Sequence, residues 1–272
     1  MMAHFVTETS ALTRRWFLRT RRQPIAIAAG LFQPLIWLFL FGSLFSRLPL
    51  SESFPAASGN YIAFLTAGVI VFTAFNSALS SGVPVLFDKE NRFLDRLFVA
   101  PLSSRYSIVA SSALHIFIMS TLQTGLVLLV ATWWGGAITL TVGSVLAILA
   151  ITGLLILGFT ILSLGLAFSL RAHFEMLSLI QVLALPMIFV STAFAPLEMM
   201  PAWLQWPASL NPLTFAIEPV RHLLLNAGAW PTGTLVTAPW GSLGLFGCIV
   251  ALLGFNLLAL FTVGSFLRKF LR

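Results

Sequence analysis

Six long apolar stretches dominate the sequence. They run over residues 25–45, 61–86, 106–132, 142–170, 174–193 and 240–267, and each is nearly free of charge. A helix needs about 20 apolar residues to cross the roughly 30 Å of hydrocarbon in a bilayer. Because 58% of the chain is hydrophobic and its mean hydropathy is +0.98, one soluble core under a polar surface is excluded. The pattern predicts an all-α polytopic membrane protein with six transmembrane helices.

The basic residues are distributed unequally between the predicted connections. Thirteen of the fifteen lysines and arginines lie in the N-terminal segment, the connections after the second and fourth stretches, and the C-terminal tail. Only Arg47 and Arg221 fall in the other connections. Since short cytoplasmic loops are enriched in Lys and Arg, both termini are expected in the cytoplasm, with the chain in a bacterial-type plasma (inner) membrane. The net charge of +7 is therefore a topology signal, and no nucleic-acid partner is expected.

The chain divides into a short N-terminal segment and one membrane domain. Residues 1–24 place Phe5, Leu12 and Trp16 on one helical face and most of their arginines elsewhere. This pattern is typical of an amphipathic helix lying in the cytoplasmic membrane interface, and a frayed basic tail is the alternative. Residues 25–272 are expected to form a single six-span domain surrounded by membrane lipid.

The connection over residues 87–102, FDKENRFLDRLFVAPL, is the most polar part of the chain. Its apolar residues, including Phe93 and Leu97, recur at helical spacing. Pro101 ends the pattern, because proline disfavours helical geometry in the residue before it. A short amphipathic helix on the cytoplasmic side is predicted.

The charges of this connection indicate what the helix contacts. Three are acidic and three are basic, whereas a helix resting on lipid favours basic residues. Mixed charge around an apolar ridge favours docking onto a protein partner, although the lipid alternative stays open. Asp88 and Arg92, four residues apart, are expected to pair along the helix.

A second unusual connection covers residues 194–228. It is too apolar for a solvated loop and too rich in proline for a straight span. Short re-entrant helices that dip part-way into the membrane fit it better, because non-helical backbone at that depth must be satisfied by protein or water. Asn211 and Pro212 have the form of a helix cap followed by a first-turn proline, and Trp203 is expected at the level of the lipid headgroups.

Two charges lie near the end of this external connection. Glu218 and Arg221 are three residues apart, which places them on one face of a helix. Pairing would lower the cost of carrying charge close to the bilayer. An ion pair is expected here.

Two segments resemble motifs of a known family. Residues 87–102 are similar to the cytoplasmic coupling segment of type-2 ABC exporter permeases of the daunorubicin-resistance and nodulation-factor type, in which an acidic and basic run precedes a leucine-rich turn and a Pro-Leu pair. PAWLQ at 201–205 and NPLT at 211–214 resemble the family's Pro-x-Trp-Leu and Asn-Pro-x-Thr segment before the last span. Arg221 matches the arginine that closes this segment.

The resemblance implies a half-transporter. Two such subunits, either two copies of this chain or this chain with a related permease, would sit over two cytoplasmic ABC ATPase subunits. The assembly would move an amphipathic drug, lipid or lipid-linked saccharide outward by alternating access. The chain contains no G-x-x-x-x-G-K-[ST] motif to cradle phosphates, so ATP and magnesium are expected on the ATPase, with no cofactor, metal or catalytic residue in this chain.

The resemblance also assigns candidate residues. Those expected to couple to the ATPase are Asp88, Glu90, Arg92, Phe93, Asp95, Leu97 and Pro101. Those expected on the substrate path, if the second and fifth spans line it, are Phe72, Phe75, Asn76, Gln181 and Leu185. Those expected to shape the external segment are Trp203, Asn211, Pro212, Glu218 and Arg221. Where the family often has a Gly-Thr step in the coupling segment, this chain has Arg92-Phe93.

Two other function classes stay open at this point. An intramembrane enzyme, for instance a lipid-modifying transferase, would need polar groups that converge at one depth. The polar residues within the spans are instead dispersed, one or two per helix: Gln33, Asn76, His115, Gln123 and Gln181. His115 is expected to be a helix-packing residue. A channel or carrier that works without ATP is the other alternative.

Overall fold

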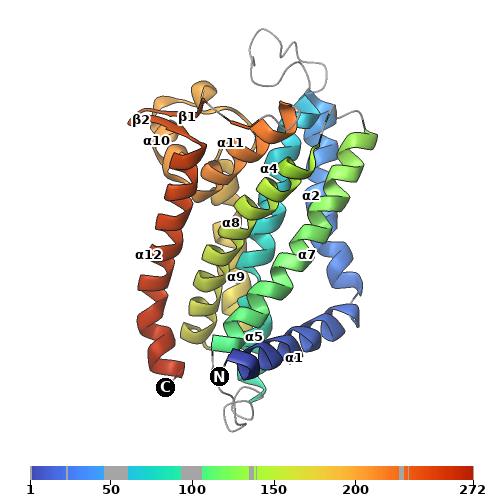
Figure 1. Ribbon diagram of the computed structural model, residues 1–272, viewed down its shortest axis with the longest axis vertical. Coiled ribbons are helices and arrows are strands. Elements are labelled where there is room, and N and C mark those ends of the chain that lie inside the picture. The colour runs from blue at the N-terminus through green and yellow to red at the C-terminus, as the bar shows by residue number, and fades with distance from the viewer. Residues whose placement is uncertain are drawn as a thin grey trace.

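The computed structural model describes residues 2–22, 24–45, 61–92, 106–134, 138, 140–226, 230–231 and 233–271. Most of these residues are helical (Figure 1). In chain order the helices are α1 (Met2–Arg21), α2 (Pro24–Phe45), α4 (Tyr61–Leu79), α5 (Gly82–Glu90), α7 (Tyr106–Trp133), α8 (Val142–Ser169), α9 (His173–Phe189), the 3-10 turn η2 (Leu197–Met199), α10 (Ala202–Leu210), α11 (Pro212–Leu225) and α12 (Leu245–Leu271). Two short strands, β1 (Thr234–Ala238) and β2 (Gly241–Gly244), precede α12.

Four helical segments of the described chain are long and apolar enough to cross a membrane. They are Tyr61–Glu90, Ala110–Trp133, Val142–Ser169 and Leu245–Gly264. Gly30–Phe45 and His173–Phe189 are apolar but shorter. The predicted class, a helical polytopic membrane protein, is therefore confirmed, whereas the count of six spans and the side of the termini stay predictions.

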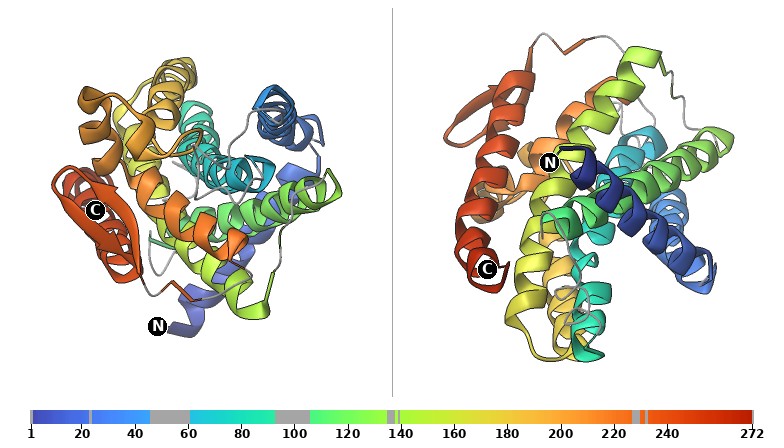
Figure 2. Two further views of the ribbon diagram at one scale, coloured as in Figure 1. Left: turned by 90° about the horizontal axis from the view of Figure 1, so that it is seen from above. Right: turned by 60° about the horizontal axis from the view of Figure 1, so that its bottom comes forward.

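The helix α4 forms the centre of the bundle. It packs against α2, α7, α8 and α11, and it lies between them in two views (Figure 1; Figure 2). Its side chains are almost all buried, and those of Phe64 and Phe75 are completely so. At one edge of the bundle, α12 leaves Phe246 and Phe261 at least 80% exposed. A helix that is apolar all round but exposed in this way is suited to face lipid.

The N-terminal segment forms the helix α1 over Met2–Arg21, so the alternative of a frayed tail is wrong. This helix lies across one end of the bundle at a steep angle to the other helices (Figure 1; Figure 2). Trp16, on its predicted apolar face, is 7% exposed, and Leu12 packs beside the same cluster. The start of α1 and the end of α12 lie at the same end of the molecule.

The expectation of an all-helical chain is wrong between α11 and α12. The strands β1 and β2 pair antiparallel as a hairpin, with Ala238 opposite Gly241. Gly241 takes a φ of +151°, which side chains other than glycine rarely adopt. The last helix consequently begins at Leu245 rather than at residue 240. The strand sequence TLVTA is rich in β-branched residues, which favour a pleated backbone.

The structure also differs from the prediction at the start of the coupling segment. Phe87 to Glu90 belong to the last turn of α5, which follows α4 after a break at Ser80 and Ser81. The helix ends because the side chain of Asn91 donates to the Phe87 carbonyl and Arg92 takes a φ of 54°. A continuous helix over 87–102 is therefore excluded at Arg92. Four coupling candidates lie outside the described residues: Phe93, Asp95, Leu97 and Pro101.

Candidate functional site

The break between α4 and α5 is held by a side chain of α8. The hydroxyl of Ser163 donates to the Leu79 carbonyl at 2.5 Å and accepts from the Gly82 amide at 2.9 Å. It therefore satisfies two backbone groups that the interrupted helix leaves free. A Cβ atom at Gly82 would lie 2.4 Å from the Ser163 carbonyl oxygen and 2.6 Å from Cε of Met176. Only glycine allows α5 to lie this close to α8 and α9.

The first charged residue of α5 binds α1. The carboxylate of Asp88 accepts from Nη2 of Arg15 at 2.6 Å and from Nη1 of Arg19 at 3.2 Å. Its side chain is only 10% exposed, whereas those of the two arginines are about one third exposed. The predicted pairing of Asp88 with Arg92 along the helix is wrong, because these two arginines of α1, some 70 residues away in sequence, hold the carboxylate instead.

The next two residues bind the ends of two other helices. Nζ of Lys89 donates to the carbonyls of Phe168 and Leu170, at 2.9 and 3.1 Å, where α8 ends. The carboxylate of Glu90 accepts from the backbone amide of His173 at 2.6 Å, where α9 begins, and also contacts its Nδ1. Each charge matches its helix end, because free carbonyls lie at the C-terminus of a helix and free amides at the N-terminus. Residues 88, 89 and 90 thus join α5 to three helices.

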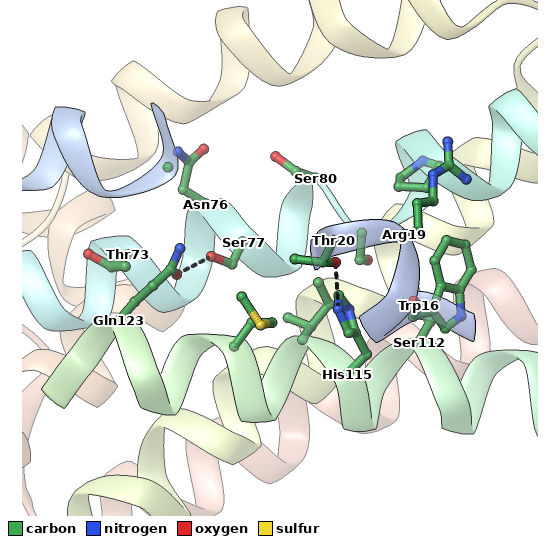
Figure 3. Close-up of a pocket in the computed structure, with 15 residues that line it drawn as sticks. Trp16, Arg19, Thr20, Thr73, Asn76, Ser77, Ser80, Ser112, His115 and Gln123 are labelled. Carbon is green, nitrogen blue, oxygen red and sulfur yellow. Dashed lines mark hydrogen bonds between the residues drawn. The ribbon is translucent and has the colours of Figure 1, made fainter. Parts of the chain in front are cut away.

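A polar cavity lies beside the same break, between α1, α2, α4 and α7 (Figure 3). Its volume is about 320 Å³. The residues that line it are Trp16, Arg19, Thr20, Gly30, Thr73, Asn76, Ser77, Ser80, Ser81, Pro84, Ser112, His115, Ile116, Met119 and Gln123. Ser77 donates to Gln123 at 3.0 Å, and Thr20 and His115 lie 3.0 Å apart (Figure 3). His115 therefore packs helices together, as predicted, while also facing the cavity.

The structure does not bring the five predicted path residues together. Phe72 stacks on Trp37 of α2 and Phe75 packs edge-on against Phe159 of α8, so both belong to the bundle core. Asn76 lines the polar cavity. Gln181 and Leu185 are exposed on α9. Their role in transport stays a prediction.

Several cavity residues were missed by reasoning from the sequence. The segment NSALSS, residues 76–81, places an amide and three hydroxyls in one and a half turns of a predicted span. Such clustering is a signal for a polar surface inside a membrane bundle. Ser112 and Thr20 carry no comparable signal, because only the packing of α1 and α7 against α4 brings them to the cavity.

The predicted ion pair of the external segment is confirmed. Nη1 of Arg221 donates to Glu218, Nη2 to the Thr192 carbonyl, and the guanidinium carbon lies 3.6 Å above the ring of Phe64. The side chain of Arg221 is 3% exposed. Burial lowers the pKa of the guanidinium, which the charge of Glu218 opposes.

The predicted helix cap at Asn211 is confirmed as well. Its side-chain oxygen accepts from the Leu213 amide at 2.9 Å, with Pro212 in the first turn of α11. Its amide nitrogen donates to the carbonyls of Met187 and Val190, which ties the start of α11 to the end of α9. Trp203, in contrast, is 74% exposed.

Comparison with known proteins agrees with the motifs. Residues 7–225 match the family described as ABC-2 type transporter. The chain is 41% identical over 263 residues to a putative transport permease, ycf38, of Porphyra purpurea, covering 97% of this chain and 89% of that protein. It is 24% identical over 249 residues to the daunorubicin resistance ABC transporter permease protein DrrB1 of Streptomyces coeruleorubidus, covering 88% of this chain and 83% of that protein. The resemblance found in the sequence is thus confirmed, and the chain belongs to the ABC-2 type transporter family as a membrane permease.

Proposed function

We propose that this permease is the membrane subunit of an ATP-driven exporter that moves an amphipathic molecule outward across the plasma membrane. It would have six spans with both termini in the cytoplasm, and it would pair with a second copy or a related permease. Two cytoplasmic ABC ATPase subunits would bind ATP and magnesium. The family supports the transport role, and the relative DrrB1 is named as an ABC transporter permease.

The observation that carries the proposal is the set of contacts made by residues 88–90. These residues begin the connection over 87–102 that the family resemblance assigns to the ATPase. A displacement of this connection would first move α5. Asp88, Lys89 and Glu90 hold α1, the end of α8 and the start of α9. A displacement of α5 would therefore reach these three helices at once.

The break at Ser80 and Ser81 would act as a hinge between α4 and α5. Hinges are a few residues at element ends that absorb changes in backbone dihedrals. Here α5 can tilt relative to α4 at the cost of the two Ser163 hydrogen bonds rather than of a continuous helix. Movement at the cytoplasmic end would thereby be converted into rearrangement of the bundle, as alternating access requires.

The partner assignment is tested by co-purification of the full chain with candidate ABC ATPases from the same genome. The wild-type chain should retain one ATPase. Phe93→Ala with Leu97→Ala should abolish retention but leave membrane insertion intact, because each apolar side chain contributes about 1.5–3 kcal/mol when fully buried in a groove. The matched control is Trp206→Ala with Leu210→Ala on α10, at the other end of the molecule, which should retain the ATPase. Retention by the Phe93 and Leu97 variant would remove the coupling role from this connection.

A further inference from the structure

The polar cavity lies where an occupant would touch the hinge of the proposed transport mechanism. Ser80 and Ser81 form the break between α4 and α5, and both line the cavity. Thr20 of α1 and Ser112 of α7 line the same cavity from the two helices that pack against α4 and α5 there (Figure 3). A bound molecule would therefore contact the two sides of the break and the helices that pack against it.

The cavity contains polar groups that the protein leaves unsatisfied. Ser81 is 3% exposed, and its hydroxyl has no hydrogen-bond partner among the described residues. No hydrogen bond links the side chains of Asn76, Ser80 or Ser112 to another of the residues drawn around the cavity (Figure 3). Elsewhere in the bundle the hydroxyls of Ser169 and Ser178 bond to carbonyls of their own helices, whereas those of Ser120, Thr160 and Thr192 also lack a partner among the described residues. The cavity differs in gathering several such side chains around one space. Unsatisfied buried polar groups are costly. Ser81 and Ser112 are buried, and Asn76 and Ser80 are partly exposed beside them, so the four together favour a ligand with several hydroxyls, each able to donate and accept.

The charged residues of the cavity indicate whether the ligand is anionic, cationic or neutral. Arg19 is the one Lys, Arg, Asp or Glu among the residues that line it, and its guanidinium is already 3.2 Å from the carboxylate of Asp88. A phosphate would find a single, shared guanidinium rather than a dedicated anion site. A cationic drug would be repelled by the same arginine. A neutral headgroup meets neither penalty.

Size and lining agree with a headgroup. Sites for whole drug-sized ligands measure roughly 300–1,000 Å³, and this cavity of about 320 Å³ is at the lower limit. Trp16, Ile116 and Met119 give it an apolar wall against which the C–H face of a sugar ring can pack. An acyl chain would have to remain outside, among lipid.

We infer that this cavity binds the neutral, hydroxyl-rich headgroup of a glycolipid, which names the substrate class for the proposed export function and rests on it. The headgroup would bridge Asn76, Ser80, Ser81 and Ser112 across the break, so that cargo and ATPase act on the same hinge. A lipid without a sugar offers fewer hydroxyls to these polar groups, and a site built to hydrogen-bond hydroxyls rejects analogues that lack them.

The test measures lipid retention by the purified full-length permease. Nanodiscs contain equal amounts of monoglucosyl diacylglycerol, phosphatidylglycerol and diacylglycerol with the same acyl chains, and native mass spectrometry counts the lipid that stays bound. The glycolipid should be retained in preference to the other two. Ser80→Ala, Ser81→Ala and Ser112→Ala combined should reduce that preference by about tenfold, because two or three hydrogen bonds are lost. Without glycolipid the triple variant should be as heat-stable as the wild type, since the three hydroxyls that it removes have no hydrogen-bond partner among the described residues.

The matched control is Ser169→Ala with Ser178→Ala, whose hydroxyls lie outside the cavity, and it should keep the wild-type preference. Methyl glucoside, which lacks the acyl chains, should compete at least about tenfold more weakly than the glycolipid. Equal competition would show a site for free sugar and would overturn the glycolipid assignment. The assignment would also be overturned if the wild type retained phosphatidylglycerol in preference, or if it retained all three lipids equally. It would fail too if the triple variant kept the wild-type preference for the glycolipid. The measurement needs no ATP and no ATPase, so its failure is separate from a failure of ATPase co-purification.

Discussion

The two ends of the molecule are held by similar contacts that differ in how exposed they are. At each end, charged side chains satisfy backbone groups where helices end or break off. At the end predicted to be external, the outer end, Arg221 is 3% exposed, its partner Glu218 is 16% exposed, and the guanidinium also holds the Thr192 carbonyl. At the end predicted to be cytoplasmic, the inner end, Asp88 is 10% exposed, but its partners Arg15 and Arg19 and the pair Glu90 and His173 are each a quarter to a third exposed.

The difference indicates which end can rearrange. A buried charge that loses its partner pays a large desolvation cost, so the outer network resists opening. A partly exposed pair exchanges its partner for water at little cost. The outer contacts therefore hold α4, α11 and the end of α9 together. The inner end can shift relative to them, and the contacts of Asp88 and Glu90 carry α1 and the start of α9 along with α5. The comparison predicts that the outer end stabilises the bundle and that the inner end transmits movement from the ATPase.

The largest expected effect is at the outer end. Arg221→Ala leaves the Glu218 carboxylate and the Thr192 carbonyl without their partner, at a cost of about 3–5 kcal/mol. The yield of folded protein and its melting temperature in detergent should fall sharply. Adding Glu218→Gln should recover part of the loss, because it removes the stranded charge. Equal and additive losses for the two substitutions would show that this end is not a coupled pair.

The next effect concerns the contact at the break. Gly82→Ala places a Cβ atom against the Ser163 backbone and Met176, and overpacking of this kind costs about 1–3 kcal/mol. Gly125→Ala on α7 is the matched control, because nothing lies within 4 Å of its added Cβ atom. It should stabilise α7 by about 0.5–1 kcal/mol through helix propensity. Thermal denaturation of both variants should give shifts of opposite sign, and a neutral result for Gly82→Ala would show that α5 does not lie tightly on α8.

A smaller stability effect is expected for Asp88→Asn. The lost charge-assisted contacts are worth about 1–2 kcal/mol, discounted because Arg15 and Arg19 are partly exposed. Substrate stimulation of ATP hydrolysis should nevertheless be lost, while basal hydrolysis remains. A stability loss as large as that of Arg221→Ala would contradict the contrast between the two ends. Arg15→Gln combined with Asp88→Asn should add little to the single change.

The smallest effect is expected for Glu90→Gln. The glutamine carbonyl can still accept from the His173 amide, so only the charge at the start of α9 is lost. No measurable change in melting temperature is expected at 0.15 M salt, where exposed charges are screened. A decrease similar to that of Asp88→Asn would show that the charge itself holds α5 to α9.

Sequence reasoning succeeded where the determinants are local. The cap at Asn211 and the pair Glu218–Arg221 depend on neighbours within four residues. The apolar stretches also locate the starts of the long helices to within a few residues. It failed where partners are distant. Asp88 has an adjacent candidate in Arg92, but α1 brings two arginines whose positions no local pattern reveals.

Two further failures have different physical reasons. The hairpin Thr234–Gly244 is too short and too apolar to be distinguished from the start of a span, because short apolar runs do not separate strand from helix. The polar cavity was missed although the segment NSALSS signals a polar surface, because serines in helices usually bond to their own backbone. That Ser81 does not do so depends on the break, which Ser163 of another helix stabilises.

When the ATPase binds ATP, α1, α5 and the start of α9 are expected to move as one unit at the inner end. This movement can be measured directly. It is tested by spin-label distances in the full transporter after replacement of Cys248, with labels at exposed positions 14 of α1, 174 of α9 and 203 of α10. The 14–174 distance should be the same with and without trapped ATP, whereas both positions should change their distance to 203. In Asp88→Asn the 14–174 distance should broaden when ATP is trapped. A change in the wild-type 14–174 distance on ATP binding would contradict the account.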